Sequence, residues 1–262
     1  MSTAAAVLSL LSGSLVGMSL GLIGGGGSIL AVPLMAYVVG LPPHAAIGTS
    51  AVAVAASALA NLGGHARART VKWPCAIVFA AAGVAGAAIG AQIGKRVDGQ
   101  ALLAAFGVLM VAVAGLMLRP RRAGHDPEVR LTRRSAARLL PPLAGTGLAV
   151  GVLSGFFGIG GGFLIVPGLI SATAMPLLNA IGSSLVSVSA FGATTAVSYA
   201  ASGLVDWRVA GLFILGGLAG GYAGIRGAKA LAGRKRLLTL VFSAVVAVVG
   251  VYVTARGLVR FF

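Results

Sequence analysis

The sequence predicts an all-α polytopic membrane protein. Of its 262 residues, 58% are hydrophobic and only 9% are charged, and the mean hydropathy is +1.02. Soluble domains carry about 25% charged residues, so this chain lacks the polar surface that contact with water requires. Its apolar stretches approach the roughly 20 residues that a helix needs to cross a bilayer. They show no alternation of apolar and polar residues, which argues against a transmembrane barrel.

Ten apolar stretches follow one another along the chain. They cover approximately residues 4–22, 28–39, 44–63, 73–94, 100–118, 139–157, 163–174, 178–200, 207–226 and 237–255. The first lacks a basic region before it, so it reads as a membrane segment rather than a cleaved signal. The second and the seventh are much shorter than the others. A helix of that length covers about 18 Å, which is less than the roughly 30 Å thickness of a hydrocarbon core. We expect these two to be half-helices or re-entrant segments.

A basic segment, Arg119 to Arg138, separates the first five stretches from the last five. It holds seven arginines and two acids. This boundary predicts a first transmembrane repeat over 1–118, a basic cytoplasmic linker over 119–138 and a second transmembrane repeat over 139–262. The net charge is +16, and most of the Lys and Arg residues that produce it lie between apolar segments. In such loops, basic residues determine the orientation of a membrane protein. The charge therefore does not predict a nucleic-acid partner, and the expected surroundings are the lipid bilayer of the cell inner membrane.

The two groups of stretches resemble each other at an offset of 134 residues. Without a gap, this offset aligns Gly24, Pro33, Pro42, Gly48, Ser50, Trp73 and Lys95 with Gly158, Pro167, Pro176, Gly182, Ser184, Trp207 and Lys229. A register that preserves proline and tryptophan over about seventy residues predicts an internal duplication.

The distribution of basic loops favours inverted repeats. The linker, the loop over 64–72 and the loop over 226–236 are rich in Lys and Arg and are expected in the cytoplasm. The counterparts of the two loops at offset 134 would then lie on the opposite side, together with both termini. Arg256 and Arg260, near the C-terminus, count against this orientation.

The candidate site lies at two glycine-rich breaks that precede the short stretches. The predicted substrate-binding residues there are Gly24, Gly25, Gly26, Gly27, Ser28, Gly158, Gly160, Gly161 and Gly162. Irregular backbone at membrane depth is tolerated where it is buried in protein or lines a wet cavity. Glycine allows a ligand to approach closely, and the free N–H groups of a following helix favour an anion. Broken helices in corresponding places of two repeats are typical of transporter sites. Close helix packing is the alternative role for these glycines.

Hydroxyl groups on the helices that follow could complete the site. They belong to Thr49, Ser50, Ser183 and Ser184. Hydroxyls can donate to a sulfonate or carboxylate oxygen. Their alternative role is hydrogen bonding within or between helices.

The four acids all lie in loops or at helix edges, so the sequence gives no intramembrane acid for a cation site. Neutral donors and helix N-termini suit a small anionic substrate instead. The sequence shows no catalytic constellation, and the spacing of His and Cys resembles no metal site, so neither an enzyme nor a cofactor is expected. A homo-oligomer is compatible with the sequence.

The segments GLIGGGGSILAVPLM at 21–35 and GFFGIGGGFLIVPGL at 155–169 resemble the signature of TauE/SafE (sulfite exporter-like) permeases. The blocks PPHAAIGTS and PLLNAIGSS and the Val-x-Trp pairs fit as well, and the resemblance covers about 7–255. It implies transport of sulfite, an organosulfonate or a related sulfur-containing anion. The second half has Ile159 where the first has Gly25, so the two half-sites need not be equivalent. An anion channel and a non-transporting membrane subunit or enzyme are the alternatives.

Overall fold

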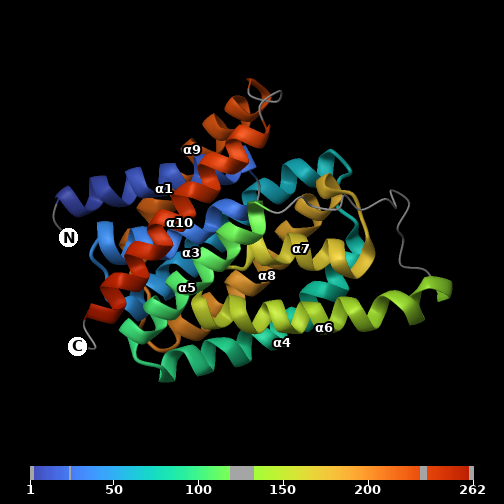
Figure 1. The fold of residues 1–262 in the computed structure, drawn as a ribbon, viewed down its shortest axis with the longest axis horizontal. Coiled ribbons are helices and arrows are strands. Elements are labelled where there is room, and N and C mark those ends of the chain that lie inside the picture. The colour runs from blue at the N-terminus through green and yellow to red at the C-terminus, as the bar shows by residue number, and fades with distance from the viewer. Residues whose placement is uncertain (1–2, 24, 119–132, 231–234, 260–262) are drawn as a thin grey trace.

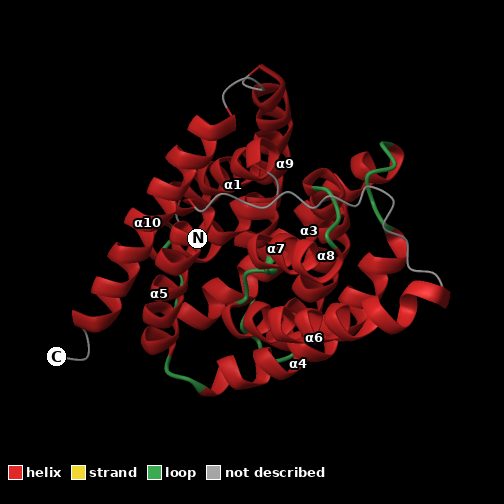
Figure 2. Ribbon diagram, turned by 45° about the vertical axis from the view of Figure 1, so that its right-hand side comes forward, coloured by secondary structure: helices red, strands yellow, loops and turns green. Residues whose placement is uncertain are grey.

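The computed structural model describes residues 3–23, 25–118, 133–230 and 235–259, and the regular structure in these ranges is helical (Figure 2). The first half contains α1 (Thr3–Ile23), the 3-10 helix η1 (Gly25–Leu30), α2 (Ala31–Pro33), the π-helix η2 (Leu34–Val38), α3 (Pro43–Arg67), α4 (Trp73–Arg96) and α5 (Gly99–Leu118). The second half contains α6 (Arg133–Phe157), α7 (Gly162–Thr173), α8 (Leu177–Ala200), α9 (Trp207–Ala230) and α10 (Lys235–Val259). The prediction of an all-α protein is confirmed.

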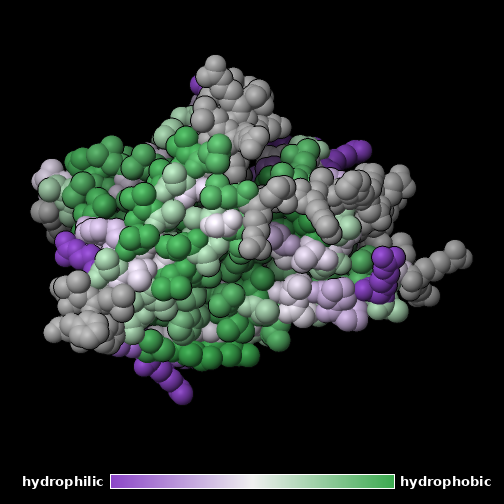
Figure 3. Space-filling view, viewed as in Figure 1, coloured by the Kyte–Doolittle hydropathy of each residue, from purple (hydrophilic) through white to green (hydrophobic). Residues whose placement is uncertain are grey.

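Seven of the described helices are long and apolar enough to cross a membrane. They lie over Thr3–Leu20, Pro43–Arg67, Trp73–Arg96, Gly99–Leu118, Ser135–Phe157, Leu177–Ala200 and Leu240–Gly257. Shorter apolar helices cover Gly27–Val38 and Gly162–Thr173, where the sequence predicts half-helices. Large apolar side chains are exposed along the spans, and Figure 3 shows a face that is mostly hydrophobic between hydrophilic margins. The chain is therefore a multi-pass membrane protein.

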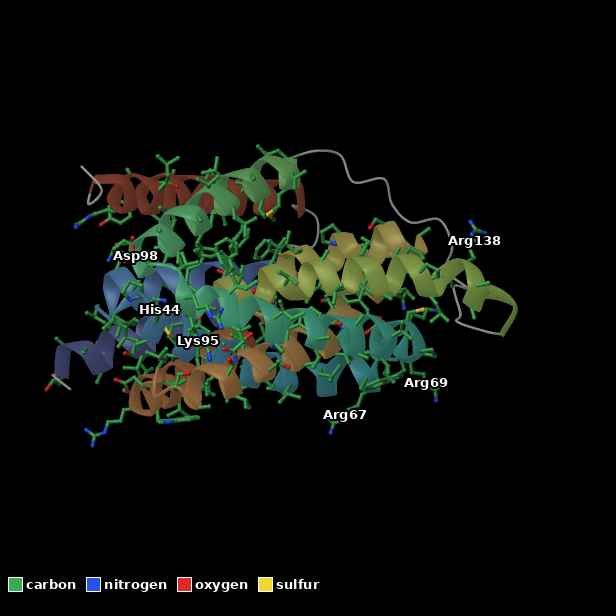
Figure 4. The ribbon with its side chains drawn as sticks, turned by 90° about the horizontal axis from the view of Figure 1, so that it is seen from below. His44, Arg67, Arg69, Lys95, Asp98 and Arg138 are labelled. Atoms are coloured by element: carbon green, nitrogen blue, oxygen red, sulfur yellow. The ribbon has the colours of Figure 1, made fainter. Side chains whose placement is uncertain are left out.

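The helices give the molecule two distinct ends. α1 begins and α10 ends at one end, whereas α6 begins at the other, so α1 and α6 run in opposite directions (Figure 1). Figure 4 places Arg67, Arg69 and Arg138 in the half of the molecule where α6 begins. His44, Lys95 and Asp98 lie toward the opposite end. Helix α6 begins at Arg133, inside the segment expected to be the linker, and 119–132 lie outside the described residues.

Glycines let the helices approach to backbone contact. α1 packs on α9, α6 on α4, α5 on α10 and α3 on α8. A Cβ atom added to Gly17 on α1 would clash with the carbonyl oxygen of Gly217 on α9. One added to Gly151 on α6 would clash with that of Gly83 on α4. The two contacts join residues that are equivalent under the 134-residue offset.

Two of the four acids cap helices. The Oδ1 atom of Asp98 accepts the N–H groups of Gln100 and Ala101, at 2.9 and 3.0 Å, at the start of α5. Asp206 accepts those of Arg208 and Val209 in the same way before α9. The bond from the Ala101 N–H is the main reason that the pKa of Asp98 lies below its usual value. These carboxylates therefore accept the free backbone N–H groups in the first turns of α5 and α9, at one end of the molecule.

Candidate functional site

The first glycine-rich break packs beside the short helix that follows the second. Helix η1, which carries the first break, packs against α7, which follows the second, and it also contacts α8. Figure 2 shows α7 among the other helices near the middle of the molecule. Segments more than a hundred residues apart in the sequence thus share one location, as a joint site requires.

The second break is a left-handed turn. Gly158, Gly160 and Gly161 have φ angles of 68°, 62° and 67°, which glycine adopts readily and other residues adopt only at a cost. The carbonyl of Gly161 accepts the N–H groups of Leu164 and Ile165, at 2.8 and 2.9 Å, in the first turn of α7. The N–H groups of Gly161, Gly162 and Phe163 precede these bonds, and none of them donates to a described backbone carbonyl. They remain available at the positive end of the α7 dipole.

The first break has a different local structure. Gly24 lies outside the described residues, and the chain continues from Gly25 as the 3-10 helix η1. Gly27 packs on α1, where an added Cβ atom would lie 2.5 Å from the backbone nitrogen of Leu20. Ser28 is fully buried. The non-equivalence that Gly25 and Ile159 suggested is therefore visible in the backbone, since one break is a tight helix and the other a turn.

Apolar side chains cover the second break. A Cβ atom on Gly158 would clash with Ile47 Cγ2 on α3. On Gly160 it would lie 2.8 Å from Val54 Cγ1, also on α3, and 3.2 Å from Val188 Cγ1 on α8. An open surface pocket of about 540 Å³ lies at the start of α3, and its lining residues, which include Pro42, Asp206 and Arg208, belong to neither break.

The four predicted hydroxyl groups are fully buried, and they divide into two kinds. Ser50 and Ser184 donate to the carbonyls of Ile47 and Ile181, at 2.9 and 2.8 Å, in the preceding turn of their own helices. Ser50 Oγ also lies 3.3 Å from the carbonyl oxygen of Gly158, so it joins α3 to the second break.

The hydroxyl groups of Thr49 and Ser183 bond to interhelical loops and not to the glycine-rich breaks. Thr49 Oγ1 accepts the N–H of Asp206 at 3.0 Å, and Ser183 Oγ accepts the N–H of Lys72 at 2.9 Å. The two bonds are again equivalent under the 134-residue offset, and each anchors the segment just before α9 or α4.

Replacing Ser183 with alanine should therefore lower stability more than substrate affinity. The change leaves the N–H of Lys72 without this acceptor, and a typical hydrogen bond contributes about 0.5–1.5 kcal/mol. The measurement is the melting temperature of the purified protein in detergent, followed by the concentration dependence of transport. An unchanged melting temperature with weakened apparent affinity would instead place this hydroxyl in the substrate site.

Sequence reasoning missed Ser154, which the structure places beside the second break. Its side chain on α6 is fully buried, and no described group bonds its hydroxyl. A Cβ atom on Gly161 would lie 3.1 Å from Ser154 Oγ. The repeat comparison could not reveal this residue because its counterpart at offset 134 is Leu20. The sequence feature that could have indicated Ser154 is its position one helical turn before the second break.

Comparison with known proteins gives a family match over most of the chain. Residues 9–253 match the family described as "Sulfite exporter TauE/SafE". Two proteins of Xylella fastidiosa, strains 9a5c and Temecula1, each named "Probable membrane transporter protein", are 51% and 50% identical, with 94% of each chain covered.

A more distant relative is "Probable membrane transporter protein YunE" of Bacillus subtilis, which is 30% identical over 83% of this chain and 85% of its own. The search of solved structures gave no match. Nearly the whole chain takes part in the family match, both glycine-rich breaks included. The chain therefore belongs to the TauE/SafE sulfite exporter family.

Proposed function

We propose that the protein is a transporter that exports a small anion, namely sulfite, an organosulfonate or a related sulfur-containing anion. The observation that carries the proposal is the buried N-terminus of α7, whose first N–H groups have no described backbone acceptor. Such a terminus attracts anions through its free donors and its dipole. The family description supplies the sulfur-containing substrate class.

The transport cycle follows from a proposed pair of inverted repeats over 1–118 and 139–262. Equivalent contacts support the repeats, because the bond from Asp206 to Thr49 has its counterpart in the bond from Lys72 to Ser183. Opposite directions of α1 and α6 support the inversion (Figure 1). Inverted repeats can exchange conformations around a central site, which exposes that site to each side in turn.

Apolar side chains cover the second break, so these side chains must move before an anion can reach it. Ile47, Val54 and Val188 close over the glycine turn from α3 and α8. An anion would reach the α7 N-terminus when either helix moves away from the turn. Helices α3 and α8 are therefore the proposed moving elements, and their mutual contact is the proposed gate.

The direct test is transport by purified protein in liposomes. The panel contains sulfite, methanesulfonate and acetate, each with and without a pH gradient. We expect saturable movement of sulfite and methanesulfonate, and the pH gradient decides whether protons are coupled. Currents far above carrier turnover in planar bilayers would favour an anion channel. Movement of no anion would favour a non-transporting membrane subunit or enzyme.

The proposed topology makes a separate prediction. Cysteines introduced by Ala68→Cys and Ala201→Cys, in a Cys75→Ser background, should react from opposite sides of the membrane. Both positions are exposed, and each directly follows its helix, Ala68 after α3 and Ala201 after α8. Position 201 should react with an impermeant thiol reagent in intact cells, and position 68 only after lysis, because the basic loop over 64–72 is expected in the cytoplasm. Labelling of both positions from outside would contradict the inverted arrangement.

A further inference from the structure

Ser154 has an unusual environment for a polar side chain. It lies on α6, one turn before that helix ends at Phe157, and its exposed fraction is 0%. No described group hydrogen-bonds its hydroxyl. Serines in membrane helices commonly donate to a carbonyl of the preceding turn, as Ser189 does to Leu185 at 2.7 Å. A buried hydroxyl without a partner is unfavourable and calls for an explanation.

The hydroxyl faces the start of α7. Gly161 is the residue just before α7, and a Cβ atom there would lie 3.0 Å from Ser154 Cβ and 3.1 Å from Ser154 Oγ. The N–H groups of Gly161, Gly162 and Phe163, which donate to no described carbonyl, belong to the same turn. An unsatisfied hydroxyl on one helix and unsatisfied N–H groups at the start of another therefore lie side by side, and both can donate.

We propose that Ser154 is a ligand of the transported anion and a determinant of its selectivity. Its hydroxyl donates to one oxygen of the anion while N–H groups of the α7 N-terminus bind the others. Donors that come from two different helices suit a pyramidal group with three oxygens, as in sulfite or a sulfonate. A planar carboxylate has only two oxygens, and both can bind N–H groups of the α7 N-terminus without the hydroxyl. This inference rests on the proposed anion transport and assigns its binding site to the second break.

The first break lacks this arrangement. The position equivalent to Ser154 is Leu20, and Gly27, equivalent to Gly161, faces backbone atoms of Ser19 and Leu20. Leucine offers no side-chain donor. The two breaks therefore differ in chemistry as well as in backbone, and the second alone combines a left-handed glycine turn with a buried, unpartnered hydroxyl in the described structure.

Three variants of the full chain test the inference. Ser154→Ala removes the hydroxyl, and Ser154→Cys keeps the size of the side chain but replaces a strong donor by a weak one. Ser243→Ala is the matched control, because Ser243 on α10 is also buried and its hydroxyl also lacks a described partner. The probes are sulfite, methanesulfonate and acetate. The readouts are the melting temperature against anion concentration, which reports binding, and the concentration dependence of flux in liposomes.

Both Ser154 variants should bind sulfite and methanesulfonate about tenfold or more weakly, as expected for one lost donor to a charged ligand. Acetate binding should change little. The melting temperature without anion should be no lower than that of the wild type, because Ser154→Ala removes a buried hydroxyl that has no described partner. Ser243→Ala should bind and move each anion as the wild type does.

Wild-type affinity for sulfite in both Ser154 variants, with transport by the wild type intact, would overturn the role of Ser154 and leave the proposed function standing. An equal loss for acetate would overturn the selectivity. If the wild type neither binds nor moves sulfite or methanesulfonate, the proposed function fails and the inference fails with it.

Discussion

Replacing Gly160 with alanine should reduce sulfite transport at least tenfold while the protein still inserts into the membrane. Gly160 has a φ angle of 62°, and an L residue in this left-handed region costs roughly 1–2 kcal/mol. An added Cβ atom would also lie 2.8 Å from Val54 Cγ1, so the side chain or the turn must shift. Each 1.4 kcal/mol corresponds to about a factor of ten, so modest distortion of the turn suffices for the expected loss.

The measurement is the initial rate of sulfite uptake into liposomes per reconstituted molecule. Gly145→Ala is the control, because Gly145 lies on α6 and no atom lies within 4 Å of the added Cβ position. The control should keep both transport and yield. Normal affinity and turnover in Gly160→Ala would show that the glycine turn has no part in the site.

Helix positions could be predicted from the sequence because they follow from local properties. The apolar stretches expected over 44–63 and 178–200 correspond to α3 and α8, which begin directly after Pro42 and Pro176. Length, hydropathy and proline act on the chain segment that contains them. The glycine-rich breaks could be located for the same reason, since glycines cluster there within a few residues.

The roles of individual polar side chains could not be predicted in this way. Ser183 bonds Lys72, which is 111 residues away, and Thr49 bonds Asp206, which is 157 residues away. Neither partner can be identified without the fold. The same limit applies to Ser154, because its importance depends on which residue of α7 faces it and on the absence of a described partner for its hydroxyl.

The difference between the two breaks was only partly visible in the sequence. Gly25 aligns with Ile159, and this single change indicated that the half-sites need not match. It did not indicate that one break would be a 3-10 helix and the other a left-handed turn. Several glycines in a row permit either conformation, so the choice depends on the packing around them.

Gly86→Ala should instead act on folding, with a several-fold loss of monodisperse protein. Gly86 lies on α4 where it crosses α6. An added Cβ atom would clash with the carbonyl oxygen of Leu148 and lie 2.9 Å from the backbone nitrogen of Val152. Backbone atoms cannot rotate out of the way, so the two helices must separate. Overpacking of this kind costs about 1–3 kcal/mol, and more where the structure cannot relax.

The equivalent change on the other helix pair should give the same result. Gly220 lies on α9, and a Cβ atom there would clash with the carbonyl oxygen of Ser14 on α1. Yield after size-exclusion chromatography and the apparent melting temperature are the measurements, with Gly115→Ala on α5 as a control whose added Cβ meets no atom within 4 Å. Transport per folded molecule should remain near that of the wild type in both variants. Full yield with lost transport in Gly86→Ala would place this glycine in the moving part of the transporter, because a contact that only packs helices affects the amount of folded protein and not its rate.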